Sequence, residues 1–197
     1  MLQRRRAVPR VARIAAAHTI ASIIAKTHWL GPGKRIGLYA SMPSELGTDP
    51  LIDLALARGC HIYLPRIISL RSRMMRFVRF RHDDHRGTRH ALGMHEPDGD
   101  ESLGARFLDT IFLPAVALDR CGARLGHGLG FYDRTLGFRQ YRQHWRGPRL
   151  VGLAYSFQVV PQVPVTATDV MMDTIVTDGG LDELLAHEDR AVDLRGR

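Results

Sequence analysis

The chain has 197 residues, 45% of them hydrophobic, so it can bury one sizeable core and is short for two. No apolar stretch reaches the ~20 residues of a membrane span, and the basic N-terminus leads into no secretory signal peptide. The net charge of +8 raises nucleic acid as a partner. However, Lys26 and Lys34 are the only lysines, which indicates a general bias toward arginine.

These features predict a single domain over 1–197, with its core at about 4–177 and a polar C-terminal tail at 178–197. Cys60 and Cys121 cannot form a disulfide framework and have no histidines at zinc-site spacing, so both are expected to be free thiols. A reducing, cytoplasmic location is therefore expected. A monomer is expected as well.

The first half of the chain alternates helical and extended patterns. Apolar residues recur at three- and four-residue spacing before a Gly-Pro-Gly turn, which is typical of an amphipathic helix. Short apolar runs predict buried strands on either side of a second helix, for which Thr48 is the expected N-cap and Gly59 the stop. In chain order, the expected elements are a helix over 11–27, a strand over 35–40, a helix from Thr48 to Gly59 and a strand over 60–64.

The second half contains more strand patterns. The continuous apolar run over 111–118 is a candidate central strand, but Pro114 indicates an edge, a bulge or a shorter strand. Strands alternating with helices predict an α/β domain with a largely parallel sheet. The expected elements are strands over 74–80, 111–118, 150–155 and 174–177, a polar connection at 82–90, and at most one short polar helix after Gly180.

Arginine is concentrated in two parts of the chain. The opening segment has no acidic residue among its arginines, and the middle segment has only Asp83 and Asp84. A solvated surface is the favoured interpretation of the middle cluster, and a binding face is the alternative. The opening cluster is Arg4, Arg5, Arg6, Arg10 and Arg13, and the middle cluster is Arg66, Arg71, Arg73, Arg76, Arg79, Arg81, Arg86 and Arg89.

The segment 119–134 carries the most specific pattern, with Gly126, Gly128 and Gly130 alternating between a predicted strand and a predicted helix. Glycines let backbone N–H groups approach an anion closely, and a helix N-terminus adds partial positive charge, so the segment can hold phosphate. A dinucleotide fingerprint does not fit, because Phe131 stands where its last glycine belongs. A Walker A loop does not fit either, because no lysine is near. From the glycines alone, a flexible turn without a ligand remains the alternative.

Charged residues flank this glycine segment. Arg124 and Arg134 could clamp phosphate oxygens, and Asp133 could coordinate a divalent cation that bridges them. The whole string resembles the signature of the 5-formyltetrahydrofolate cyclo-ligase family, also called 5,10-methenyltetrahydrofolate synthetases. The matching residues are Asp119, Gly122, Arg124, Leu125, Gly126, Gly128, Gly130, Phe131, Tyr132, Asp133 and Arg134.

Further matches follow in the family's order over about 4–177. The resemblance implies a cyclo-ligase-like three-layer α/β/α fold with a mostly parallel sheet. It also implies an ATP- and Mg²⁺-dependent closure of 5-formyltetrahydrofolate to 5,10-methenyltetrahydrofolate, with release of ADP and phosphate through a phosphorylated formyl group. The matches outside the glycine segment include Tyr39, Ser41, Met42, Glu45, Thr48, Leu64-Pro65, Glu96-Pro97, Leu113-Pro114, Gly152, Ala154, Gln158, Pro164-Val165, Asp169, Asp173 and Thr177.

The resemblance also implies site residues. Arg124, Tyr132 and Asp133 match catalytic positions, and Asp133 and Asp169 match magnesium ligands. Positions that match the ATP site are Arg4, Arg5, Arg6, Arg124, Leu125, Gly126, His127, Gly128, Leu129, Gly130, Phe131, Tyr132 and Arg134, with no separate role for His127 or Leu129. Positions that match the folate site are Ala40, Met42, Glu45, Gly128, Gly130 and Phe131.

The N-terminus departs from the family pattern. Family members carry a basic pair on a short N-terminal helix that reaches the ATP phosphates, and this chain opens almost directly on Arg4, Arg5 and Arg6. Either these arginines substitute for the pair or the true start lies before Met1. The alternatives to an active cyclo-ligase are a diverged homologue and a basic nucleic-acid-binding protein. The middle arginines are also candidates for binding a polyglutamate tail of the folate.

Overall fold

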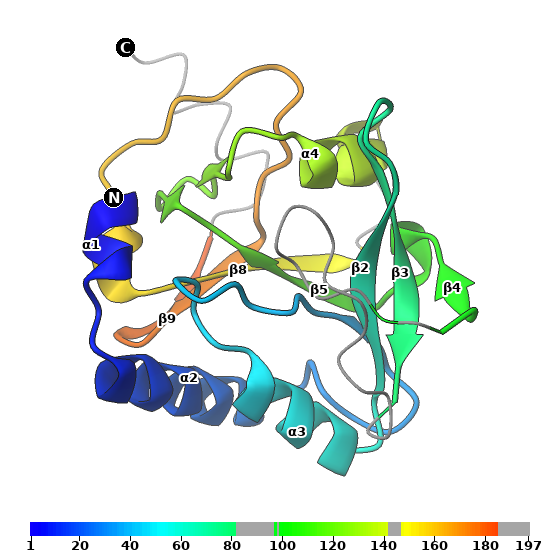
Figure 1. The fold of residues 1–197 in the computed structure, drawn as a ribbon, viewed down its shortest axis with the longest axis horizontal. Coiled ribbons are helices and arrows are strands. Elements are labelled where there is room, and N and C mark those ends of the chain that lie inside the picture. Colours follow the sequence, from blue (N-terminus) through cyan, green and yellow to red (C-terminus); the bar gives the residue numbers. More distant parts are fainter. Residues whose placement is uncertain (82–96, 98, 142–146, 185–197) are drawn as a thin grey trace.

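The centre of the computed structural model, which describes residues 1–81, 97, 99–141 and 147–184, is an eight-stranded sheet (Figure 1). Its strands are β1 (Arg35–Gly37), β2 (His61–Ser69), β3 (Met74–Phe80), β4 (Ser102–Leu103), β5 (Thr110–Pro114), β8 (Arg149–Ala154), β9 (Thr174–Thr177) and β10 (Gly180–Glu183). The order is β10-β9-β8-β5-β1-β2-β3-β4. The strands from β9 to β2 pair in parallel, and the antiparallel pairs lie at the two ends.

Helices lie on both faces of this sheet. The longer pair, α2 and α3, covers one face, and the short α4 with two 3-10 turns lies on the other (Figure 1). Two of the three hydrophobic clusters among the described residues fill the two sides of the sheet, as the predicted layered α/β fold with a mostly parallel sheet requires. The helical elements are α1 (Leu2–Arg6), α2 (Arg10–Ala25), η1 (Ala105–Phe107), α3 (Asp49–Ala57), α4 (Phe131–Leu136), η2 (Gly137–Tyr141) and η3 (Ser156–Gln158).

The predicted helix over 11–27 is confirmed as α2. Ala17, Ile20 and Ile24 are buried on its inner face, as the three- and four-residue spacing predicts. Ile14 is 50% exposed, so it does not belong to the buried face of α2, in contrast to its predicted place in the apolar pattern. The predicted second helix is confirmed as α3, and Gly59 follows it with a φ of 73°, the left-handed conformation that glycine adopts without strain.

Two strands differ from the predicted ranges around a proline. The strand predicted over 60–64 is observed as β2, which continues through Pro65. On one side of β2, the pairing with β1 ends at Tyr63. Beyond Tyr63, β2 has β3 as its ladder partner, so a residue without an N–H is tolerated there. The apolar run over 111–118 is split, and β5 ends at Pro114, in agreement with the shorter strand considered above.

The end of the described chain corrects one expectation. Gly180–Glu183 forms β10, an antiparallel edge strand on β9, so a polar helix immediately after Gly180 is wrong for these residues. A hairpin turn places β10 beside β9, where its backbone groups gain ladder partners. The polar connection predicted at 82–90 lies outside the described residues.

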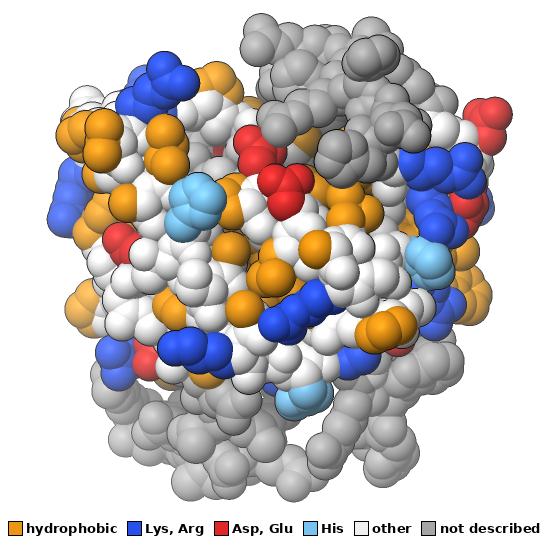
Figure 2. All heavy atoms as spheres, turned by 90° about the horizontal axis from the view of Figure 1, so that it is seen from below, with side chains coloured by type: hydrophobic (Ala, Val, Ile, Leu, Met, Phe, Trp, Pro, Cys, Tyr) orange, Lys and Arg blue, Asp and Glu red, His pale blue; other side chains and the backbone are white. Residues whose placement is uncertain are grey.

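The surface charge bears on the nucleic-acid alternative. On the face that lies lowest in Figure 1, the described Lys and Arg side chains occur in separate places among hydrophobic atoms (Figure 2). Such scattered cations are typical of a solvated surface. Within the described residues, no helix has the length and apolar character needed to cross a membrane.

Candidate active site

A cleft of about 780 Å³ lies where β1 and β5 end. In open parallel sheets, ligands bind beyond the carboxyl ends of the strands, so its position suits a substrate site. Seven segments line it: α1, α2 through Arg13, the loop after β1, the β2–β3 pair through Pro65 and Met75, the end of β5 with the residues that follow it, the glycine segment, and the segment that holds Pro164 and Asp169. Its size is within the range of small-molecule sites.

The glycine segment is held by a small hairpin of β6 (Ala117–Leu118) and β7 (Arg124–Leu125). At its turn, the buried carboxylate of Asp119 accepts hydrogen bonds from the N–H groups of Cys121 and Ala123, both at 2.9 Å. Its other oxygen accepts from the N–H of Val163 at 2.8 Å. Asp119 therefore fixes the start of the glycine segment against a distant part of the chain.

Each glycine of the loop meets a different local requirement. Gly128 and Gly130 have φ values of 82° and 68°, which side-chain-bearing residues rarely adopt. A Cβ on Gly126 would lie 2.8 Å from Nη1 of Arg124, a distance that forces a shift. The three glycines thus keep the loop backbone open on the cleft side, as a close approach to an anion requires.

Arg124 and Asp133 are paired with each other across the loop. Nη2 of Arg124 donates to both carboxylate oxygens of Asp133, at 3.1 and 3.2 Å. The Arg124 side chain is only 4% exposed, and its guanidinium lies 5.4 Å from the centre of the Tyr132 ring. The predicted phosphate ligand and the predicted metal ligand therefore form one charged unit, which sequence spacing alone does not show.

The chain segments that carry the two predicted magnesium ligands, Asp133 and Asp169, lie side by side. The N–H of Val170, the residue after Asp169, lies 3.4 Å from Oδ1 of Asp133. Within the described chain no three His, Cys, Asp or Glu side chains form a metal cluster. Two carboxylates nevertheless fit Mg²⁺, which commonly takes one or two protein oxygens and completes its shell with phosphate oxygens and water.

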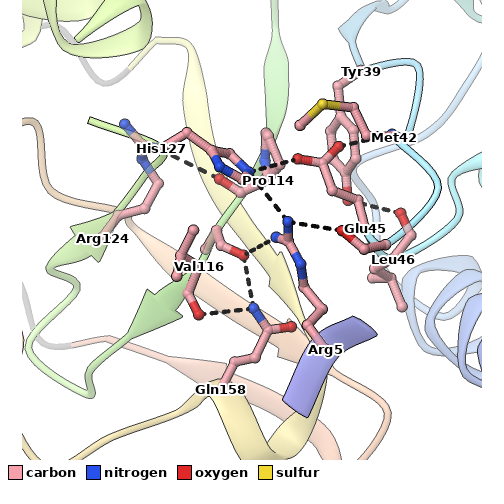
Figure 3. A network of polar contacts seen from close by, with 12 residues as sticks. Arg5, Tyr39, Met42, Glu45, Leu46, Pro114, Val116, Arg124, His127 and Gln158 are labelled. Carbon is pink, nitrogen blue, oxygen red and sulfur yellow. Dashed lines mark hydrogen bonds and ion pairs between the residues drawn. The ribbon is translucent and has the colours of Figure 1, made fainter. Parts of the chain in front are cut away.

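Arg5 extends from α1 into the centre of the cleft and is 2% exposed (Figure 3). Its Nη1 donates to the carbonyl oxygen of Ala115 at 3.2 Å, and its Nη2 donates to Oγ of Ser44 at 3.3 Å. Gln158 donates to the same Ala115 oxygen at 2.7 Å, which fixes that acceptor. The short helix with Arg5 therefore supplies a cation to the site from the N-terminus.

Both buried arginines keep a free donor. In the described part of the chain, the Nε atoms of Arg5 and Arg124 have no hydrogen-bond partner. A buried N–H of a charged group is expensive to leave unpaired, so each of these two N–H groups could donate to an anion bound at the site. The arginines on the cleft thus fit a phosphate-bearing ligand.

The loop after β1 presents Glu45 to the cleft. Its Oε2 accepts a hydrogen bond from the N–H of Met42 at 3.0 Å, and its side chain is 5% exposed. Thr48 occupies the predicted N-cap position of α3, but its hydroxyl donates to the carbonyl oxygen of Tyr39 at 2.6 Å instead of capping. Tyr39 in turn donates to the carbonyl oxygen of Leu46, so the loop is tied at both ends.

Two tyrosines beside Glu45 are held in the neutral form. Burial, and then the charge of Glu45, raise the pKa of Tyr132 well above its ordinary value, although Arg124 lowers it. Burial is also the main cause that raises the pKa of Tyr39, with Glu45 next. Tyr132 lines the cleft, so its hydroxyl is available there as a hydrogen-bond donor at all ordinary pH values.

The cleft brings together most of the residues expected at the site. It is lined by Arg5, Arg6, Ala40, Met42, Glu45, every residue from Arg124 to Asp133, and Asp169. Arg4 and Arg134 do not line it. Arg4 lies 4.8 Å over the ring of Phe157, and Arg134 is exposed on α4. Local sequence patterns predict no role for Ser44 and Gln158, which position Arg5, or for Met75 in the wall, because these contacts are long-range.

Comparisons with known proteins identify the family of this chain. A model of the 5-formyltetrahydrofolate cyclo-ligase family matches residues 1–178. A 5-formyltetrahydrofolate cyclo-ligase of Escherichia coli (strain K12) is 35% identical over 144 residues, covering 72% of this chain and 76% of that protein. A probable 5-formyltetrahydrofolate cyclo-ligase of Caenorhabditis elegans is 31% identical over 166 residues, covering 79% and 78%.

A solved structure has the same fold. The NMR structure of the Aquifex aeolicus 5,10-methenyltetrahydrofolate synthetase superposes with a TM-score of 0.77 at 28% identity, covering 94% of this chain and 89% of that one. The family match, residues 1–178, includes the glycine segment and every strand of the sheet except β10. On this basis the chain belongs to the 5-formyltetrahydrofolate cyclo-ligase family.

Proposed function

We propose that this protein uses ATP to close 5-formyltetrahydrofolate to 5,10-methenyltetrahydrofolate, with release of ADP and phosphate. The observation that carries the proposal is one cleft in which Arg5, Arg124 and the open glycine loop face Glu45 and an apolar wall. Cationic donors suit the ATP phosphates, and a carboxylate beside apolar side chains suits a flat heterocycle with N–H groups. Family membership supports the pairing of these two ligands.

On the phosphate side, the chain's groups act by position and charge. The formyl oxygen on N5 is a poor leaving group, so ATP phosphorylates it, N10 attacks, and phosphate departs. Arg5 and Arg124 donate hydrogen bonds to phosphate oxygens, and the loop N–H groups hold the phosphates in place. Asp133 and Asp169 would hold Mg²⁺, which neutralises phosphate charge when it is bound.

On the folate side, Glu45 orients the substrate. Its carboxylate accepts hydrogen bonds from the ring amino group and the neighbouring nitrogen of the pterin, and Ala40 and Met42 form the apolar wall. The neutral Tyr132 stacks on or donates to the bound ligands. We also propose that the protein works as a monomer in the cytoplasm, where its free Cys60 and Cys121 would stay reduced.

The proposed reaction has a direct spectroscopic test. The purified protein, mixed with 5-formyltetrahydrofolate, Mg²⁺ and ATP, is expected to produce absorbance in the methenyl-folate band. Omission of ATP or addition of a chelator should abolish the increase, because the formyl oxygen then remains a poor leaving group. A folded protein that gives no increase would favour a diverged homologue, and a steep salt dependence of binding to nucleic acid would favour the basic binder.

The turn between β2 and β3 is proposed to bind the glutamate tail of the folate. Arg71 and Arg73 are exposed in this turn, and Arg76 is exposed on the adjoining strand β3. A Cβ placed on Gly130 would lie 3.5 Å from Nη1 of Arg73. The turn therefore adjoins the glycine loop at the edge of the cleft. Arg86 and Arg89 of the same sequence cluster lie outside the described residues.

Removing two of these cations should affect long-tailed substrates selectively. The double variant Arg71→Ala/Arg73→Ala is expected to raise KM for a pentaglutamate form about fivefold, since exposed ion pairs are individually weak. KM for the monoglutamate should stay nearly constant. Steady-state kinetics with both forms measure this, with Arg120→Ala, an exposed arginine outside the cleft lining, as the control. Equal KM values for the two forms in the unaltered protein would remove the basis for this role.

A further inference from the structure

Three side chains from different segments meet in the cleft: Arg5 of α1, Glu45 of the loop after β1, and His127 of the glycine loop (Figure 3). Nη2 of Arg5 lies 3.2 Å from Nε2 of His127, and the same His127 atom lies 3.4 Å from Oε1 of Glu45. The Arg5 and Glu45 residues are 2% and 6% exposed. His127 therefore joins a residue proposed for ATP to a residue proposed for folate.

Nε2 of His127 can form only one of these two hydrogen bonds at a time. When Nε2 of His127 carries no hydrogen, it can accept from Arg5, and when it carries one, it can donate to Glu45. It cannot satisfy both neighbours at once. The cluster is thus made of the same groups that the proposed function assigns to the two substrates.

Each substrate has to break this same cluster. An ATP phosphate near the glycine loop takes hydrogen bonds from Arg5 and draws His127 away from Glu45. A pterin that donates to Glu45 replaces His127 from the opposite side. The free energy needed to break the contacts of His127 is subtracted from the binding free energy of the first ligand. The second ligand then binds to Arg5 or Glu45 without that cost.

We propose that His127 couples the binding of the two substrates, so that each raises the affinity of the protein for the other. This inference rests on the proposed function. His127 acts through Arg5 and Glu45 and is a positioning residue. Because binding free energies are linked, the factor by which folate strengthens ATP binding must equal the factor by which ATP strengthens folate binding.

The coupling can be measured with a non-hydrolysable ATP analogue by calorimetry. Saturating 5-formyltetrahydrofolate is expected to lower the Kd of the analogue about tenfold, and the analogue should lower the Kd of the folate by the same factor. In His127→Ala the factor should fall close to one, whatever the Kd of either ligand alone. His127→Gln retains an N–H donor and an oxygen acceptor, so it should keep most of the coupling.

Controls separate this inference from the proposed function. His18→Ala changes an exposed histidine of α2 outside the cleft lining and should leave the factor unchanged. An unchanged factor in His127→Ala, or no coupling in the unaltered protein, would overturn the inference, while ATP-dependent turnover would leave the proposed function standing. A protein that binds neither ligand and shows no turnover would overturn both.

Discussion

Replacement of Arg124 by alanine is expected to lower kcat by about 10³-fold, a loss typical of removing an arginine that stabilises a transferring phosphoryl group. The structure adds a second effect. Arg124 is almost fully buried against the carboxylate of Asp133, so its loss leaves that carboxylate without its main partner. Because Asp133 is 24% exposed and can be hydrated, the free energy of unfolding should fall by only about 1–3 kcal/mol. Turnover assays and urea unfolding of the same preparations separate the two effects.

The chain offers a matched control for this variant. Nη2 of Arg139 also donates to both oxygens of an aspartate, Asp173, at 2.6 and 2.8 Å, and its side chain is 12% exposed. Neither residue lines the cleft. Arg139→Ala should therefore reduce stability to a similar extent and leave kcat nearly constant. If both variants lost activity in proportion to their stability, Arg124 would be a structural residue and not a catalytic one.

Replacement of Glu45 by glutamine should raise KM for 5-formyltetrahydrofolate about 30-fold, with a much smaller change in KM for ATP. A carboxylate accepts on both oxygens, whereas an amide would turn an N–H₂ group toward the donors of the pterin. Loss of a hydrogen bond to a charged group costs about 1.5–3 kcal/mol, and the buried position of Glu45 leaves little water to compensate. Steady-state kinetics with each substrate varied in turn give both constants.

Glu101→Gln is the control for this change. Glu101 accepts hydrogen bonds from Arg79 and Tyr63, with no part in lining the cleft. The hydrogen bond from Arg79 holds the pKa of Glu101 below its ordinary value, so Glu101 is charged at neutral pH. Its replacement should leave both KM values unchanged. A Glu45→Gln enzyme with normal KM for the folate would show that the pterin is bound elsewhere.

Local sequence patterns were enough to locate most elements. The apolar spacing of α2 and the bounds of β3 and β9 depend on short-range regularities, because a helix and a strand each impose their own side-chain period. The predicted strand over 60–64 ends before Pro65, whereas β2 continues through it. A proline is excluded from a strand only where both of its neighbouring strands pair with that residue, and at Pro65 only β3 does. Whether a strand has a second neighbour is decided by the sheet order, which no local pattern contains.

The site likewise has some features that follow from local sequence and others that depend on the tertiary structure. The glycine segment and the family resemblance identified the loop and its charged residues from sequence alone, because a phosphate-binding loop concentrates its requirements in consecutive residues. The partnership of Arg124 with Asp133 and the meeting of Arg5, Glu45 and His127 were not identified. These contacts join α1, the loop after β1 and the glycine loop, so only the packing of distant segments around the parallel sheet determines which charges become partners.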